Sequence, residues 1–248
     1  MLSTLEIEFK KDDNIKLNLN AGSLMQGVLM ENIDFDYAQY LHENSIHPYS
    51  QYLYKDNSKQ SYVWKISTLN QEAKVEIIDK IKKIEQIYIK HNNVTLSVKS
   101  ANVIREVSYK EFANKYVLDD KVQKKSVIKF ITPTTFKSQG YYLNFPQIHN
   151  IYSNLLAKWN MFSKEISLQD KDVLNHLINY THISGYKLRS TKFQMESIKI
   201  NSFLGEVCVL INGPLTLVAI ANLLFAYSEF SGIGAKTSMG MGGVKIGK

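Results

Sequence analysis

Residues 232–242 read Gly-Ile-Gly-Ala-Lys-Thr-Ser-Met-Gly-Met-Gly, two glycine-apolar-glycine triplets around a five-residue spacer. Glycine has no side chain, so its backbone can approach a bulky polyanion closely. Successive N–H groups of such a loop can bind phosphate oxygens, and a lysine and hydroxyls can complete the site. The stretch predicts a phosphate-binding loop, with the candidate contacts Gly232, Gly234, Lys236, Ser238, Gly240 and Gly242. The alternative is a glycine-rich hairpin that binds nothing, because glycines commonly occur in turns.

The spacing of these glycines excludes the commoner nucleotide motifs. The stretch lacks the Gly-x4-Gly-Lys-Ser/Thr pattern of a mononucleotide P-loop. It does not lie between a first strand and a helix, where a dinucleotide fingerprint occurs. Instead it follows an apolar, helix-like run at 215–227 and leads into a short predicted strand at 244–246.

The first half of the chain shows one cycle of alternating elements. Apolar residues alternate at Leu5, Ile7 and Phe9, which is typical of a half-buried strand. The further predicted elements are helices at 23–33 and 35–43, hairpin strands at 49–54 and 61–67, an amphipathic helix at 71–86 and a strand at 94–98. The order βαββαβ predicts a ferredoxin-like unit.

A similar cycle follows the charged stretch 119–125, which we interpret as a linker. The predicted elements are strands at 127–131, 187–200, 206–211 and 244–246, and helices at 148–159 and 215–227. We therefore expect an α+β protein with two tandem ferredoxin-like domains and antiparallel sheets. The domains would span residues 1–120 and 126–248.

The charge balance favours a polyanionic partner. Lysine and arginine together number 30 against 23 acidic residues, a formal net charge of +7. Ordinary surface lysines would give the same balance, so charge alone does not identify the partner. Arginine occurs only at Arg105 and Arg189. We therefore do not expect bidentate hydrogen bonds from arginine to guanine bases to contribute much to recognition.

The single cysteine, Cys208, lies in an apolar run and has no partner for an internal disulfide. We expect a small buried side chain in a cytoplasmic protein. No run of about 18 apolar residues suggests a membrane span, and charges at residues 6, 8 and 10 argue against a signal peptide. No Cys/His cluster has zinc spacing and no acidic cluster suggests a metal site, so we predict neither metal nor cofactor.

The glycine pattern at the C-terminal end resembles the signature of CRISPR-associated proteins with paired ferredoxin-like domains. Three further stretches, 25–30, 40–50 and 132–137, resemble the repeat-processing endoribonucleases of that group. The sequence of residues 229–238 is most similar to that of members that serve type III systems. The resemblance implies a metal-independent endoribonuclease that binds CRISPR repeat RNA and cuts precursor transcripts into guide units. It implies products with 2′,3′-cyclic phosphate and 5′-hydroxyl ends, and transient contact with a type III effector complex. Whether the protein forms a homodimer is left open by the resemblance.

Two histidines, His42 and His47, lie in the segment that carries this resemblance. Imidazole is the side chain best suited to move protons near neutral pH. His42 matches the catalytic histidine of the family, and the end of a helix would favour its protonated, acidic form. Met30 stands where several members have a tyrosine as general base, and a thioether cannot accept that proton. Either His47 replaces the base, or RNA positioning does most of the work; packed, non-catalytic histidines are the alternative.

For RNA binding outside the glycines we predict Lys137, Arg189, Lys192 and Lys236. Lys137 precedes an exposed turn, and Arg189 and Lys192 lie on a predicted strand. The alternative for these residues is a solvated strand. A non-catalytic RNA-binding subunit of a CRISPR effector complex is the competing function, and a ferredoxin-like metabolite-binding regulator is a more distant one.

Overall fold

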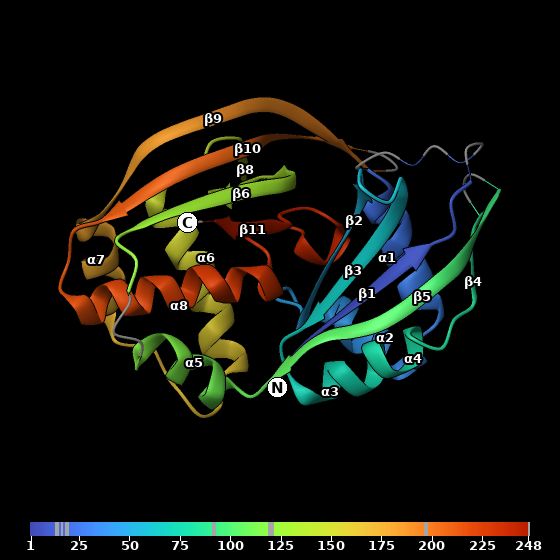
Figure 1. Cartoon of the computed structure of the whole chain (residues 1–248), viewed down its shortest axis with the longest axis horizontal. Coiled ribbons are helices and arrows are strands. Elements are labelled where there is room, and N and C mark those ends of the chain that lie inside the picture. Colours follow the sequence, from blue (N-terminus) through green and yellow to red (C-terminus); the bar gives the residue numbers. More distant parts are fainter. Residues whose placement is uncertain are drawn as a thin grey trace.

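Two antiparallel sheets organise the chain (Figure 1). The structure is a computed structural model and describes residues 1–12, 15, 17, 20–90, 93–118, 122–195 and 198–247. The first part of the predicted linker, residues 119–121, lies outside this range. In the described chain no helix is long and apolar enough to cross a membrane.

The first sheet has five strands in the order β2-β3-β1-β5-β4. Its strands are β1 (Leu2–Phe9), β2 (Tyr49–Asp56), β3 (Ser61–Thr68), β4 (Gln86–Ile89) and β5 (Val94–Val107). β1 lies in the middle and pairs antiparallel with β3, where Leu5 faces Ile66 and Ile7 faces Trp64. Without the edge strand β4, the order is that of a ferredoxin-like unit, which confirms the prediction for this half.

Helices cover one face of the first sheet. They are α1 (Ala21–Glu31), α2 (Phe35–Glu43), α3 (Gln71–Ala73), the π-helical segment η1 (Lys74–Ile78) and α4 (Asp79–Ile81). Their buried side chains join those of the sheet in one apolar cluster, in which Met25 and Leu29 of α1 accompany Ile77 and Ile81. Burying this apolar face is the main force that fixes the helices on the sheet.

The helix predicted at 71–86 is wrong in two respects. It ends at Ile81, because the chain turns and begins β4 at Gln86. The π-helical turns of η1 also change which side chains face the core, so that Val75 is exposed while Ile77 is buried. A wider turn takes up an additional residue and rotates the helix surface, which a regular periodicity cannot anticipate.

The second sheet has four strands in the order β11-β6-β10-β9, the ferredoxin-like order again. Its strands are β6 (Lys125–Thr134), β9 (Thr181–Gln194), β10 (Lys199–Ile211) and β11 (Val244–Gly247). A small hairpin of β7 (Phe136–Ser138) and β8 (Tyr141–Leu143) follows β6. The helices of this half are α6 (Ile148–Phe162), α7 (Lys171–Tyr180), α8 (Leu215–Ser231) and the short 3₁₀ turn η3 (Thr237–Met239).

Two predictions for the second half need correction. The strand predicted at 187–200 spans a turn: β9 ends at Gln194, and the N–H of Met195 donates to the carbonyl of Ile198 before β10 begins. Cys208 is half-buried, not buried, because it alternates along β10 with the fully buried Val207 and Val209. The strand period of two places it on the opposite face of the sheet.

The two halves share part of their core. Helix α5 (Tyr109–Val117) follows the first sheet in sequence, yet Figure 1 shows it beside α8 of the second half. Its buried residues Tyr109 and Phe112 belong to the same apolar cluster as Phe230. A polar link lies nearby, where Arg105 pairs with Glu229 at 2.7 Å. The exact boundary between domains at 120–126 stays a prediction.

Candidate functional site

His47 and Ser238 bring the two predicted site segments together. The Oγ atom of Ser238 lies 2.6 Å from Nδ1 of His47. The imidazole also stacks on the ring of Tyr49, with centroids 5.7 Å apart and planes 5° from parallel. A serine hydroxyl can donate or accept here, so the contact holds the ring in place in either tautomer.

Burial lowers the pKa of His47. Hydrogen bonds to the backbone of Leu41 and Asn44 oppose this shift, and the nearby positive charges of His42 and Lys158 add to it. The net direction favours a neutral imidazole near pH 7. A neutral ring can accept a proton, which suits the part of a general base.

His42, five residues before His47 in the sequence, is in a different setting. It is exposed in the last turn of α2, which Asp34 caps at the opposite end by accepting from the N–H of Asp36. The chain after α2 turns through Asn44, whose side chain donates to the carbonyl of Tyr40. Residues 43–46 connect the two histidines along the chain.

The glycine loop is held mainly by its own hydrogen bonds and close backbone packing. The N–H of Ile233 donates to the carbonyl of Gly242 at 2.9 Å, and the N–H of Gly242 donates to Pro133 at 3.1 Å. The N–H of Gly234 donates to Oδ1 of Asn154 at 2.9 Å. Because these N–H groups already have acceptors, they satisfy the loop itself. Contact of Gly232, Gly234, Gly240 and Gly242 with RNA stays a prediction.

Gly240 shows why the loop needs glycine. Its φ is +97°, and a Cβ atom built there would lie 2.5 Å from the Cα of Gly22 on α1. Gln51 joins the loop to α1, since its Nε2 donates to the carbonyls of Gly22 at 2.7 Å and Ser238 at 3.0 Å. The Nε1 of Trp64 fixes the Gln51 amide from the other side at 2.9 Å. The loop of the second domain is thus clamped against α1 and β2 of the first.

A cavity of about 420 Å³ lies beside the His47–Ser238 contact. His47, Lys137, Lys236 and Ser238, all predicted from the sequence, line it. Lys236 itself has a left-handed backbone, with φ at +58°, which is uncommon for a residue with a side chain. Burial, and then the charge of Lys137, lower the pKa of Lys236.

Arg189 and Lys192 are not among the residues that line this cavity. Both are exposed on β9, where Arg189 faces Leu204 and Lys192 faces Asn201 of β10. Their contact with RNA stays a prediction. Met30 is half-buried and packs against the apolar cluster of the first domain.

The cavity contains a residue that sequence reasoning missed. Lys158 of α6 is 6% exposed and lines the cavity together with Asn154. A signal was present in the sequence, because Lys158 falls three residues after Leu155 and seven after Ile151, on the apolar stripe of the helix. A lysine on such a stripe is unusual, since lysine is rarely buried.

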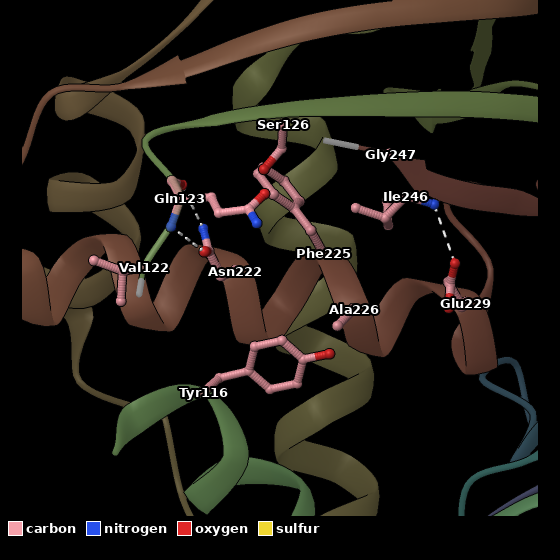
Figure 2. Close-up of a pocket in the computed structure, with 10 residues that line it drawn as sticks. All are labelled: Tyr116, Val122, Gln123, Ser126, Asn222, Phe225, Ala226, Glu229, Ile246 and Gly247. Carbon is pink, nitrogen blue, oxygen red and sulfur yellow. Dashed lines mark hydrogen bonds between the residues drawn. The ribbon is translucent and has the colours of Figure 1, made fainter. Parts of the chain in front are cut away.

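A second cavity, of about 210 Å³, lies between α5, α8 and β11 (Figure 2). Two of its polar side chains, those of Asn222 and Glu229, bond to the backbone of other lining residues. Asn222 accepts from the N–H and donates to the carbonyl of Gln123, and Glu229 accepts from the N–H of Ile246. We therefore assign this cavity to the packing of α8. In the described part of the chain, no group of three or more His, Cys, Asp or Glu side chains could hold a metal ion.

Comparisons with known proteins agree on one family. The family model of the CRISPR-associated endoribonuclease Cas6 matches residues 128–244. The Cas6 endoribonuclease of Streptococcus thermophilus is 29% identical over 245 residues, which covers 99% of this chain and 98% of that protein. The Cas6 endoribonuclease of Mycobacterium tuberculosis (strain CDC 1551 / Oshkosh) is 29% identical over 227 residues, which covers 91% of this chain and 71% of that protein.

Solved structures show the same fold at lower identity. A product complex of Cas6 (TTHA0078) has a TM-score of 0.82 at 16% identity and covers 100% of this chain and 99% of that one. A product complex of Cas6 (TTHB231), from Thermus thermophilus, has a TM-score of 0.79 at 20% identity, with 99% and 100% covered. At these identities the likeness concerns the fold alone.

Proposed function

We propose that this chain, which is similar to the Cas6 family of CRISPR-associated endoribonucleases, binds CRISPR repeat RNA and cleaves precursor transcripts into guide units. The relatives support the endoribonuclease activity and the CRISPR substrate. One observation carries the proposal to a site: His47 of the first domain contacts Ser238 of the glycine loop beside a basic cavity.

The cleavage step that we propose uses the nucleophile of the RNA itself. The 2′-oxygen attacks the adjacent phosphorus while its proton passes to the neutral ring of His47. The bond to the 5′-oxygen breaks, and His42 donates the proton that this oxygen needs. The products are a 2′,3′-cyclic phosphate and a 5′-hydroxyl. Every proton is supplied or accepted by an imidazole, so the step needs no metal ion.

The cavity would bind the phosphate that is cut. Lys137 and Lys236 would bind the phosphate oxygens through their positive charge, in the bound substrate as in the transition state. Ser238 would keep the imidazole of His47 oriented, as the third member of a catalytic group often does. Arg189, Lys192 and the four loop glycines would bind flanking parts of the RNA. Contact with a type III effector complex, assembly into a homodimer and a cytoplasmic location stay predictions.

The test is a cleavage assay with repeat RNA from the source genome in the presence of EDTA, with the ends of the products mapped. We expect a 2′,3′-cyclic phosphate and a 5′-hydroxyl. RNA with a single 2′-deoxy nucleotide 5′ of the cut should bind but stay intact. Cleavage of the deoxy substrate, or strict dependence on magnesium, would contradict the mechanism. Tight binding of the natural repeat without any cleavage would indicate a non-catalytic RNA-binding subunit.

A further inference from the structure

Lys158 is a buried lysine without a carboxylate among its hydrogen-bond partners. Its Nζ donates to the carbonyl of Ser231 at 2.8 Å, to Oγ1 of Thr237 at 3.1 Å and to the carbonyl of Gly232 at 3.4 Å. These three acceptors match the three donors of an ammonium group. They come from the end of α8 and from the glycine loop, so Lys158 ties together the two segments that carry the loop.

The cavity beside Lys158 gathers positive charge. Lys137 and Lys236 line it with Lys158 and His47, and none of its lining residues is an aspartate or glutamate. The groups influence one another: the charge of Lys158 is among the causes that lower the pKa of His47, and the charge of Lys137 acts likewise on Lys236. Positive charges gathered around one cavity favour the binding of an anion there.

We propose that Lys158 is a positioning residue of the RNA phosphate subsite. Its ammonium supplies buried positive charge to the cavity and holds Thr237 where the neighbouring Ser238 meets His47. The inference rests on the proposed function and adds to it the residue that couples phosphate binding to the geometry of the imidazole. The ligand class is a phosphate diester of RNA.

Protonation links the two parts of this role. Burial lowers the pKa of Lys158 to about 7, so in the free protein the neutral amine is well populated at slightly alkaline pH. A phosphate in the cavity favours the ammonium, because an opposite charge nearby raises the pKa of an amine. RNA binding at about pH 8 should therefore take up a proton at Lys158.

Other titratable groups face the cavity, and their contributions must be separated from that of Lys158. They are His47 from the turn after α2, Lys137 from β7, Tyr142 from β8 and Lys236 from the glycine loop. The last residue of α8, Ser231, contributes a carbonyl oxygen to Lys158, while the carboxylate of Glu229 on the same helix pairs with Arg105. His47 has a lowered pKa and therefore titrates on the acid side of the range in question.

The first test measures the affinity for the uncleavable 2′-deoxy repeat RNA between pH 6.5 and 9 at constant ionic strength. For the wild type, the affinity should fall by up to about tenfold per pH unit above pH 7, one proton being linked to binding. Lys158→Met should bind more weakly at pH 7 and show a flatter pH dependence. Lys110→Met, a change of an exposed lysine on α5, should keep the wild-type profile. In His47→Ala and Lys236→Ala, the part of the slope of log affinity against pH that comes from Lys158 should remain.

Lys158→Arg provides a rescue, because a guanidinium stays charged over this range. It should restore affinity at pH 9 relative to Lys158→Met and flatten the pH dependence. A second measurement needs no variant: calorimetry of RNA binding to the wild type at pH 8 in two buffers that differ in heat of ionisation. We expect uptake of about 0.5–1 proton per RNA.

The outcomes separate the inference from the function. Wild-type protein that cleaves repeat RNA but takes up no proton on binding would overturn the role of Lys158 and leave the proposed function standing. Equal pH profiles of the wild type and folded Lys158→Met would overturn it as well. Wild-type protein that neither binds nor cleaves repeat RNA would overturn the proposed function itself.

Discussion

Ser238 Oγ and His47 Nδ1 lie 2.6 Å apart, although 191 positions separate the two residues in the sequence. The contact joins the turn after α2 in the first domain to the glycine loop of the second. It connects the segment expected to do the chemistry with the segment expected to hold the RNA. A disturbance of the loop should therefore reach the imidazole, and mutations on the two sides should not act independently.

Replacement of His42 tests the proposed acid. His42→Ala should lower the single-turnover rate of cleavage by roughly 10²–10⁴-fold, the usual contribution of a positioned acid or base. Because the side chain is exposed at the end of α2, folding and RNA affinity should change little. Rapid-quench kinetics at saturating protein measures the rate. His149→Ala, an exposed histidine of α6, serves as control and should cleave like the wild type; an equal rate in His42→Ala would exclude this acid.

The pH profile of cleavage tests His47. Burial lowers the pKa of this imidazole. The ring therefore becomes protonated only at a lower pH than an ordinary histidine does. A general base must be neutral, and the rate should therefore drop as the pH falls through this lowered pKa. His47→Ala should remove that acid limb and slow cleavage. Ser238→Ala should keep the limb but shift it and reduce the rate more mildly. An acid limb that persists unchanged in His47→Ala would assign it to another group.

A side chain at Gly240 should destabilise the fold. Gly240→Ala places a Cβ atom 2.5 Å from the Cα of Gly22, at a φ of +97°. Backbone on both sides must then move, and we expect a loss of about 2 kcal/mol or more in the free energy of unfolding. Gly27→Ala on α1, where a Cβ atom would meet nothing within 4 Å, is the matched control and should be neutral or stabilising. Urea unfolding measures both; similar stabilities would show that the loop tolerates separation from α1.

The salt dependence of RNA binding tests Lys236. Its side chain lines the cavity beside Lys137, so removal of its charge should cost a phosphate contact. Lys236→Ala should weaken binding and reduce the slope of log affinity against log salt by about one unit. The cleavage rate at saturating protein should change much less. Titrations at several salt concentrations would measure the slope, and an unchanged slope would place Lys236 outside the RNA contact.

The pH dependence of stability tests the burial of Lys158 without RNA. Its pKa is lowered to about 7 in the folded chain, below the usual value of an unfolded lysine. Between these values the unfolded chain binds more protons, so the stability rises with pH and is lost as the pH falls toward 7. The free energy of unfolding of the wild type minus that of Lys158→Met should therefore increase with pH, by up to about 1.4 kcal/mol per pH unit between pH 7 and 10. A constant difference would mean that the amine is not desolvated in the folded state.

Local sequence patterns determined the architecture of both halves. Alternation at Leu5, Ile7 and Phe9 predicts β1, and the apolar run at 215–227 predicts α8; both are confirmed. These predictions succeed because strand and helix periods depend on neighbours two to four residues apart. Elements with weaker patterns were missed, namely β4, α5, α7 and the β7–β8 hairpin, and the π-helical η1 was read as regular helix.

The sequence by itself determined which residue types were available: histidines near a helix end, glycines at the spacing of the loop, and many lysines beside only two arginines. Only the tertiary structure decided which of them meet. It placed Ser238 on His47, Gly240 on Gly22, and Lys158 under the loop between Ser231 and Thr237. It also left Arg189 and Lys192 on β9, outside the lining of the cavity. Such contacts join positions far apart along the chain and arise from the docking of two domains, which buries shared apolar surface and leaves no periodic trace in the sequence.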